Sequence, residues 1–150
     1  MKKEGLEVQE LFGGCICCVM QLDLILTLKK IQQTIAPEWV LLEPTGAADP
    51  GEVGKAVNAR APFVDKVKMV VLLDAPRFGM FSNMMSPMIT NQINAADIVA
   101  INKIDEVSED ELETIKSTVA GYTDSTDVVS ICAEDGTGVD SLLDMIFNDD

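Results

Sequence analysis

The sequence has 150 residues, 47% of them hydrophobic, with 25 acidic and 11 basic side chains and no histidine. This is enough apolar material for one domain with its own core and no disulfide support. The formal net charge of −14 argues against a nucleic acid or an anionic membrane surface as main partner, because both require clustered Lys and Arg. The absence of His excludes Ser-His and Cys-His catalysis and every His-ligated metal site.

The cellular compartment is indicated by the N-terminus and by the cysteines. Residues 1–4 are Met-Lys-Lys-Glu and do not start the apolar run of a signal peptide, and charges and prolines interrupt the later apolar stretches. Three of the four cysteines are crowded within four positions, which is not the pattern of a secreted disulfide framework. We therefore expect a cytoplasmic protein.

Apolar periodicity predicts strands and helices in alternation along the chain. Residues 6–12 alternate as a short strand, and residues 19–36 repeat at helical spacing until Pro37. The other predicted strands are 39–42, 67–73, 98–101 and 128–131, and the other predicted helices are 82–95, 109–119 and 139–147. Strands that alternate with helices predict a single α/β domain, with a mostly parallel sheet and helices on both faces.

Polar side chains follow four of the predicted strands directly. They are Glu43, Asp74, Asn102 and the pair Cys132-Ala133. In open α/β sheets the ligand lies outside the carboxyl ends of the strands. We therefore expect these residues to line one site.

Asn102-Lys103-Ile104-Asp105 matches the N-K-x-D guanine-recognition motif of GTPases. A carboxylate at Asp105 accepts hydrogen bonds from N1 and N2 of guanine, while the Lys103 stem lies along the base and Asn102 braces neighbouring loops. Cys132-Ala133 stands where GTPases carry a Ser-Ala-Lys-like loop, whose backbone N–H meets guanine O6. The alternative is an ordinary polar turn between a strand and a helix, in which Asn and Asp are common.

Glu43-Pro44-Thr45-Gly46 resembles the acidic-x-x-Gly segment that senses the γ-phosphate. Glu43, the candidate catalytic residue, would hold Mg²⁺ through water, and the Gly46 N–H would meet the terminal phosphate. The alternative is a simple Pro-Gly turn. The nearby Gly54-Lys55 pair is not a phosphate loop, because Asp49 and Ala56 stand where the motif needs Gly and Ser or Thr.

Cys15, Cys17 and Cys18 follow a pair of glycines at 13–14. Thiolates at this spacing are able to hold Zn²⁺ or a similar ion, with a carboxylate, water or partner residue completing a tetrahedral site. Two other interpretations remain open: a redox-active thiol pair and buried structural cysteines.

Together these motifs resemble the CobW branch of the GTPases that also include the UreG and HypB metallochaperones. The resemblance implies a P-loop-NTPase-like G domain of three layers that binds GTP or GDP with Mg²⁺. It also implies delivery of zinc, cobalt or a corrinoid to a client metalloprotein or corrinoid protein. The residues that carry the resemblance are Glu10-Leu11, Gly14-Cys15-Ile16-Cys17-Cys18, Asp23-Leu24, Glu43-Pro44-Thr45-Gly46, Asp49-Pro50, Asp74-Ala75, Gln92, Ala96-Asp97 and Asn102-Lys103-Ile104-Asp105.

The sequence also departs from the family pattern. The family begins with a strand, a Gly-rich Lys-Ser/Thr phosphate loop and a helix, and ends with a smaller C-terminal domain; this chain carries none of these. We therefore expect residues 1–150 to be one partial G domain with weak or no GTP hydrolysis alone. Either these residues are a fragment of a longer product, or another chain or a rearranged strand fills the gap. The expected protein partner is a chain that supplies the phosphate loop, or a second copy in a homodimer. The alternatives are a nucleotide-independent metal-binding or interaction module derived from such a domain, and a thiol redox protein.

Overall fold

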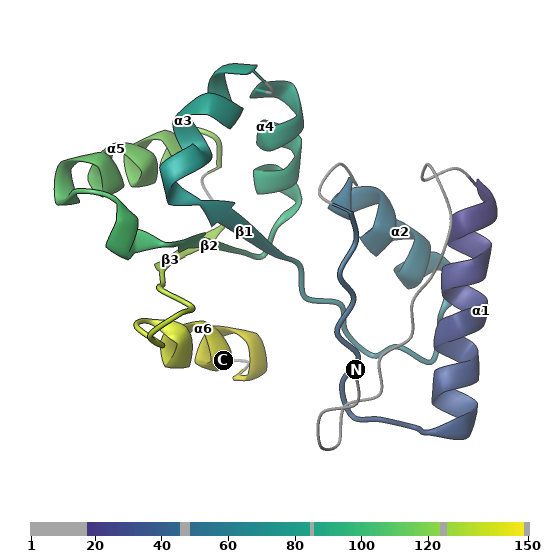
Figure 1. The fold of residues 1–150 in the computed structure, drawn as a ribbon. Helices are drawn as coiled ribbons and strands as arrows, with labels where there is room; N and C mark the ends of the chain where they lie inside the picture. The colour runs from purple at the N-terminus through teal and green to yellow at the C-terminus, as the bar shows by residue number, and fades with distance from the viewer. Residues whose placement is uncertain (1–17, 46–48, 85, 124–125, 149–150) are drawn as a thin grey trace. The chain divides into compact units, whose positions relative to one another are not determined.

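The computed structural model describes residues 18–45, 49–84, 86–123 and 126–148. These residues form two compact units (Figure 1). The first unit contains residues 18–45 and 55–65, and the second contains residues 49–54 and 66–148. The second unit carries the sheet.

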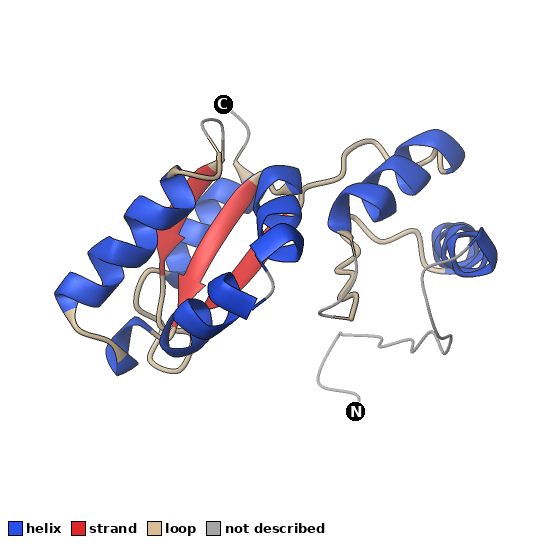
Figure 2. Ribbon diagram, turned by 90° about the horizontal axis from the view of Figure 1, so that it is seen from above, coloured by secondary structure: helices blue, strands red, loops and turns tan. Residues whose placement is uncertain are grey.

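The sheet consists of three parallel strands in the order β1-β2-β3 (Figure 2). They are β1 (Val70–Asp74), β2 (Ile98–Asn102) and β3 (Asp127–Ser130). The central strand β2 reads Ile-Val-Ala-Ile and is buried on both faces, as the sequence pattern of a parallel strand requires. The register pairs Asp74 with Asn102, so β1 and β2 end level with each other. The predicted parallel arrangement is confirmed for these three strands.

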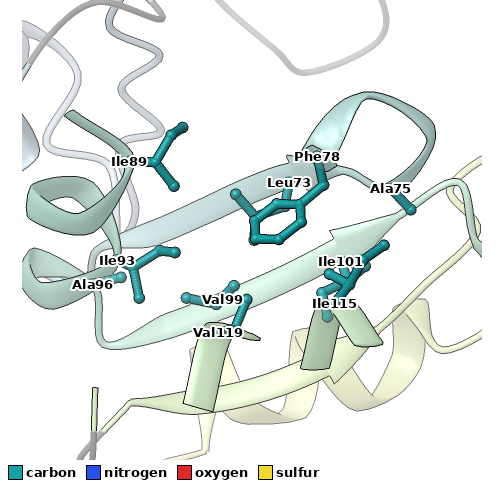
Figure 3. Close-up of a cluster of buried hydrophobic side chains, with 10 residues drawn as sticks. All are labelled: Leu73, Ala75, Phe78, Ile89, Ile93, Ala96, Val99, Ile101, Ile115 and Val119. Atoms are coloured by element: carbon teal, nitrogen blue, oxygen red, sulfur yellow. The ribbon is translucent and has the colours of Figure 1, made fainter. Parts of the chain in front are cut away.

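Three helices pack on one face of this sheet: α3 (Ala75–Met84), α4 (Ser86–Ala95) and α5 (Glu109–Ala120). Side chains from these helices meet alternate residues of β1 and β2 and form the larger core of the unit, because residues two apart on a strand point to the same face. Its buried members are Leu73, Ala75, Phe78, Ile89, Ile93, Ala96, Val99, Ile101, Ile115 and Val119 (Figure 3).

The opposite face of the sheet is covered by α6 (Val139–Phe147), which has the bounds predicted from the sequence. Ile98 and Ala100 of β2 pack here with Ile131 and Leu142. Helices therefore lie on both faces, and the second unit is a three-layer α/β structure of the P-loop-NTPase type, as predicted.

Two helix starts show how local chemistry fixes the ends of elements. Ser108 caps α5 in a capping box, accepting the Glu111 N–H while the Glu111 carboxylate accepts the Ser108 N–H. Asp49 caps α2 (Pro50–Arg60) by accepting from the amides of Gly51 and Glu52 at 2.9 and 3.2 Å. The Asp-Pro sequence at this start is typical of a helix N-terminus, although no helix was predicted here.

The predicted strand over residues 39–42 is wrong, because this stretch forms no strand in the structure. It follows α1 (Cys18–Thr34) in the first unit, and Leu41 is 97% exposed. An apolar run becomes a strand only when a neighbouring backbone pairs with it, and the sequence pattern does not report that pairing. Residues 6–12, the first predicted strand, lie outside the described part of the chain.

The predicted helix over residues 82–95 is also wrong in extent, since the structure has two helices, α3 and α4, in this region. Pro87 explains the break. Proline has no N–H to donate and is tolerated only in the first turn of a helix, so a new helix starts at Ser86.

Candidate functional site

The carboxyl ends of β1 and β2 bring Asp74 and Asn102 side by side, because these two residues are partners in the parallel register. Ile131 follows β3, and its amide donates to the carbonyl of Ile101 at 2.8 Å, which carries the pairing one residue further. Cys132 and Ala133 come directly after this point. The structure therefore places three of the four predicted strand-end positions at one edge of the sheet.

Asn102 ties together the two loops that leave this edge. Its side-chain oxygen Oδ1 accepts from the backbone N–H of Lys103 at 2.8 Å and from that of Ala133 at 3.0 Å. The side chain therefore braces the loop after β2 against the loop after β3, in the way that was predicted for it. The Ala133 amide, expected to meet guanine O6, is the donor in this brace.

Lys103 has left-handed backbone dihedrals, with φ 64° and ψ 42°, which L-residues other than Asn and Asp seldom adopt. Its ammonium Nζ lies 3.1 Å from Oδ2 of Asp74, on the neighbouring strand end. Asp105 follows in a short 3-10 turn, Ile104–Glu106, and its side chain is exposed. The Asp105 carboxylate is therefore exposed to solvent, close in the chain to Lys103, whose ammonium contacts the end of β1.

Cys132 lies below this surface, 3% exposed, in a tight loop. Its amide donates to the Thr137 carbonyl and its carbonyl accepts from the Gly136 amide, each at 2.9 Å. A hydrogen bond between the thiol and the Asp105 carboxylate raises the pKa of Cys132, against the opposing effect of the Asp135 amide. The thiol is therefore neutral at physiological pH and contacts the carboxylate predicted to bind guanine.

Gly138 fixes the end of the same loop. It has φ 72°, and a Cβ atom there would lie closer to the Ser130 carbonyl oxygen than van der Waals contact allows. Gly136 also has a positive φ, 88°, but a Cβ atom there would meet open space. Only glycine fits at 138 without moving the backbone of β3.

The other predicted site residues fall elsewhere. Glu43 lies in the first unit, is exposed, and does not follow a strand. Cys15, Cys17 and Gly46 lie outside the described residues, and Cys18 is described only as the first residue of α1. Within the described ranges, no group of three or more Cys, Asp or Glu side chains is arranged to hold a metal ion.

The region around Gly54-Lys55 is helical, because both residues lie within α2. In the part of the chain that the structure covers, no helix is both long and apolar enough to cross a bilayer.

The ion pair between Asp74 and Lys103 was missed by the sequence analysis. Asp74 was expected at the site but was given no role, because nothing in the order of residues says that a lysine 29 positions later reaches it. The level ends of two adjacent parallel strands are the feature that brings them together.

Comparison with known proteins adds to this geometry. Residues 1–130 match the family model described as CobW/HypB/UreG, nucleotide-binding domain. The chain is 29% identical over 115 residues to the "Zinc chaperone YeiR" of Escherichia coli, covering 75% of this chain and 35% of the relative. It is 26% identical over 141 residues to the "Zinc chaperone CobW" of a Sinorhizobium species, covering 78% and 40%.

A eukaryotic relative is the "Zinc-regulated GTPase metalloprotein activator 1" of Dictyostelium discoideum, 19% identical over 144 residues, with 79% of this chain and 30% of the relative covered. No solved structure gives a significant match. The matches span 30% to 40% of the length of these relatives.

The family match covers most of the chain and includes the ends of β1 and β2 with Asn102, Lys103 and Asp105. This chain belongs to the CobW/HypB/UreG family, as a member of its nucleotide-binding domain.

Proposed function

We propose that this chain is the guanine-nucleotide-binding part of a GTPase metallochaperone, in which the state of the nucleotide controls the binding and delivery of a metal ion. The observation that carries the proposal is the double hydrogen bond of Asn102 Oδ1, to the amides of Lys103 and Ala133. This brace holds the turn that carries Asp105 against the loop that follows β3. A base-binding pocket needs these two loops in fixed relation.

Guanine recognition is assigned to Asp105. Its exposed carboxylate is an acceptor for the N1 and N2 donors of guanine, which adenine does not present. The buried Cys132 thiol hydrogen-bonds to the same carboxylate, which raises the pKa of the thiol. Guanine O6 is assigned to the amide of Ala133, which would share its hydrogen between the base and Asn102.

Nucleotide titration by calorimetry tests this assignment. Asp105→Asn should weaken GDP binding by about 100-fold or more, because two hydrogen bonds to a charged acceptor are lost. The same variant should gain affinity for xanthosine diphosphate, whose C2 carbonyl accepts from the new amide.

Glu106→Gln is the matched control, because Glu106 is an exposed acid in the same turn. Equal GDP affinity in the wild type and in Asp105→Asn would contradict the assignment.

Metal binding is assigned to Cys15, Cys17 and Cys18, with Zn²⁺ as the first choice. Two bacterial relatives are named as zinc chaperones, and thiolates are preferred ligands of zinc. Co²⁺ is the second choice, since it accepts the same tetrahedral ligands. Glu43 and Gly46 are assigned to Mg²⁺ and the γ-phosphate.

Metal titration tests the cysteine assignment. The variant with Cys15, Cys17 and Cys18 all changed to Ser should lose stoichiometric Zn²⁺ binding and the thiolate charge-transfer absorption of the Co²⁺ form. Met84→Leu removes an exposed soft sulfur elsewhere and should change neither measurement. Zinc binding retained by the triple variant would refute the assignment, and zinc binding without GDP binding would favour the nucleotide-independent module.

The wider role follows from these two sites. We assign residues 1–150 to one partial G domain that functions in the cytoplasm. Its phosphate-binding loop would come from another chain or segment. A homodimer is the other assembly that we propose. The client would be a metalloprotein or a corrinoid protein that receives the metal when the nucleotide state changes.

A further inference from the structure

The ammonium of Lys103 is held by a carboxylate on the neighbouring strand end. Nζ of Lys103 lies 3.1 Å from Oδ2 of Asp74, so the four-carbon stem of the lysine extends from the end of β2 toward the end of β1. The lysine side chain is 43% exposed, and the aspartate side chain is 25% exposed. An extended lysine stem at a ligand-binding edge presents an apolar surface rather than a point charge.

Asp74 is itself held in place from two sides. It is the last residue of β1, paired in register with Asn102, and its Oδ1 accepts from the Arg77 amide at 3.2 Å in the first turn of α3. The positive end of the helix favours a carboxylate at this position. The Arg77 guanidinium lies farther away, with Nε 4.0 Å from Oδ2. The anchor for Lys103 is therefore a fixed group and not a mobile surface acid.

The backbone of Lys103 is strained, because this residue has a positive φ of 64°. It is one of two non-glycine residues with positive φ in the described ranges; the other is Ala36, in the first unit. Left-handed residues cluster at functional sites, where the surrounding structure enforces them. Here the Asn102 brace fixes the backbone of Lys103, and the Asp74 carboxylate fixes its side-chain end.

We propose that Asp74 is a positioning residue of the nucleotide site: its ion pair holds the Lys103 stem extended as the apolar floor on which the purine ring rests. The proposal rests on the proposed function. A partly exposed ion pair contributes little to folding, so the contact between Asp74 and Lys103 serves to orient the lysine, whereas the stabilising contact of Asp74 is the one with the Arg77 amide. The floor contacts the face of the ring, whereas Asp105 contacts its edge. The two acids should therefore affect binding in different ways.

Affinities for GDP and for inosine diphosphate separate the two roles, because inosine lacks the N2 amino group but keeps the same ring system. Asp74→Asn should weaken both nucleotides by the same factor, about 3- to 10-fold, leaving their ratio unchanged. Asp105→Asn should instead make the affinities for GDP and for inosine diphosphate nearly equal, because the contact with the N2 amino group is lost. Asp74→Asn keeps the acceptor for the Arg77 amide, so its thermal midpoint should match that of the wild type.

A double-mutant cycle tests whether Asp74 acts through the lysine. Lys103→Met keeps an apolar stem without the charge, and in that background Asp74→Asn should have no further effect on either nucleotide. Glu113→Gln is the control, since it removes a similar exposed ion pair, to Lys116 on α5, away from the site, and should leave both affinities unchanged.

Three outcomes contradict parts of this account. If the wild-type chain binds GDP and Asp74→Asn binds it equally well, the inference is overturned and the proposed function stands. An Asp74→Asn effect that persists in Lys103→Met also overturns the inference, because Asp74 then acts independently of the lysine. If the wild-type chain binds no guanine nucleotide, both the proposed function and the inference fall.

Discussion

Two glycines in the loop after β3 illustrate how much a single residue decides at this site. Gly136 and Gly138 share a positive φ, but only Gly138 faces the carbonyl of Ser130 at a distance that excludes a side chain. This carbonyl belongs to the last residue of β3, and Ile131 and Cys132 follow it into the site. The glycine therefore fixes the position of the loop that Asn102 braces.

Substitution of each glycine by alanine tests this difference. Gly136→Ala should cost about 1 kcal/mol, because it adds only the strain of a left-handed alanine. Gly138→Ala should cost about 3 kcal/mol or more, because the backbone must also move to relieve the overlap. Urea unfolding measures the free energy of unfolding of both variants. Nearly equal losses of stability would show that the contact with the Ser130 carbonyl does not add to the cost at position 138.

Among the helices, α5 has the most complete set of end signals. Ser108 and Glu111 form the capping box, and Gly121 ends the helix with its amide donating to the carbonyls of Ser117 and Thr118. The backbone and side chain of Ser108 donate to the Glu111 carboxylate, and these hydrogen bonds lower the pKa of Glu111 below its ordinary value of 4.5. The two residues of the capping box lie three positions apart, Ser108 at the N-cap and Glu111 in the first turn.

Ser108→Ala should reduce the free energy of unfolding by about 1 kcal/mol at neutral pH, because the Glu111 amide loses its side-chain acceptor and the Glu111 carboxylate loses the Ser108 hydroxyl. The lowered pKa of Glu111 means that the folded state prefers the ionised form. Its contribution is therefore present above the ordinary pKa and is lost as the pH falls through the folded-state value.

The measurement is urea unfolding of wild type and Ser108→Ala across the acid range. The difference between them should shrink as Glu111 becomes protonated. A wild-type advantage that stayed constant to low pH would contradict the role assigned to the carboxylate.

The whole molecule carries 25 acidic side chains against 11 basic ones. Such a net charge destabilises the compact state through self-repulsion, which salt screens. Raising NaCl from about 0.01 M to 0.15 M shortens the screening length from about 30 Å to 8 Å. The thermal midpoint should therefore rise over this range, and calorimetry would measure it.

Choline chloride at the same ionic strength is the control for screening, because it supplies charge without a metal cation. A similar rise with both salts supports general screening. A midpoint that fell with added salt would show that attractive ion pairs, such as Lys103 with Asp74, outweigh the repulsion.

The sequence alone determined most of the second unit. The apolar run of β2 and the periodicity of α6 were sufficient to predict these two elements, because strands and helices repeat with different periods. The N-K-x-D motif that begins at Asn102 marked the carboxyl-end edge of the sheet. The sequence did not resolve the break at Pro87 or the helix that begins after Asp49, although both carried known local signals. It also predicted a strand at 39–42 where the structure has none, because strand formation depends on a partner that no local pattern contains.

Only the tertiary structure decided which groups meet. The bonds from Asn102 to Ala133 and from Asp74 to Lys103 each span about 30 residues of sequence. They form because adjacent parallel strands end level with each other, which fixes the distance between side chains that the sequence separates. The residue types therefore indicated which hydrogen bonds and ion pairs these side chains are able to form. The register of the sheet determined which of the side chains come into contact.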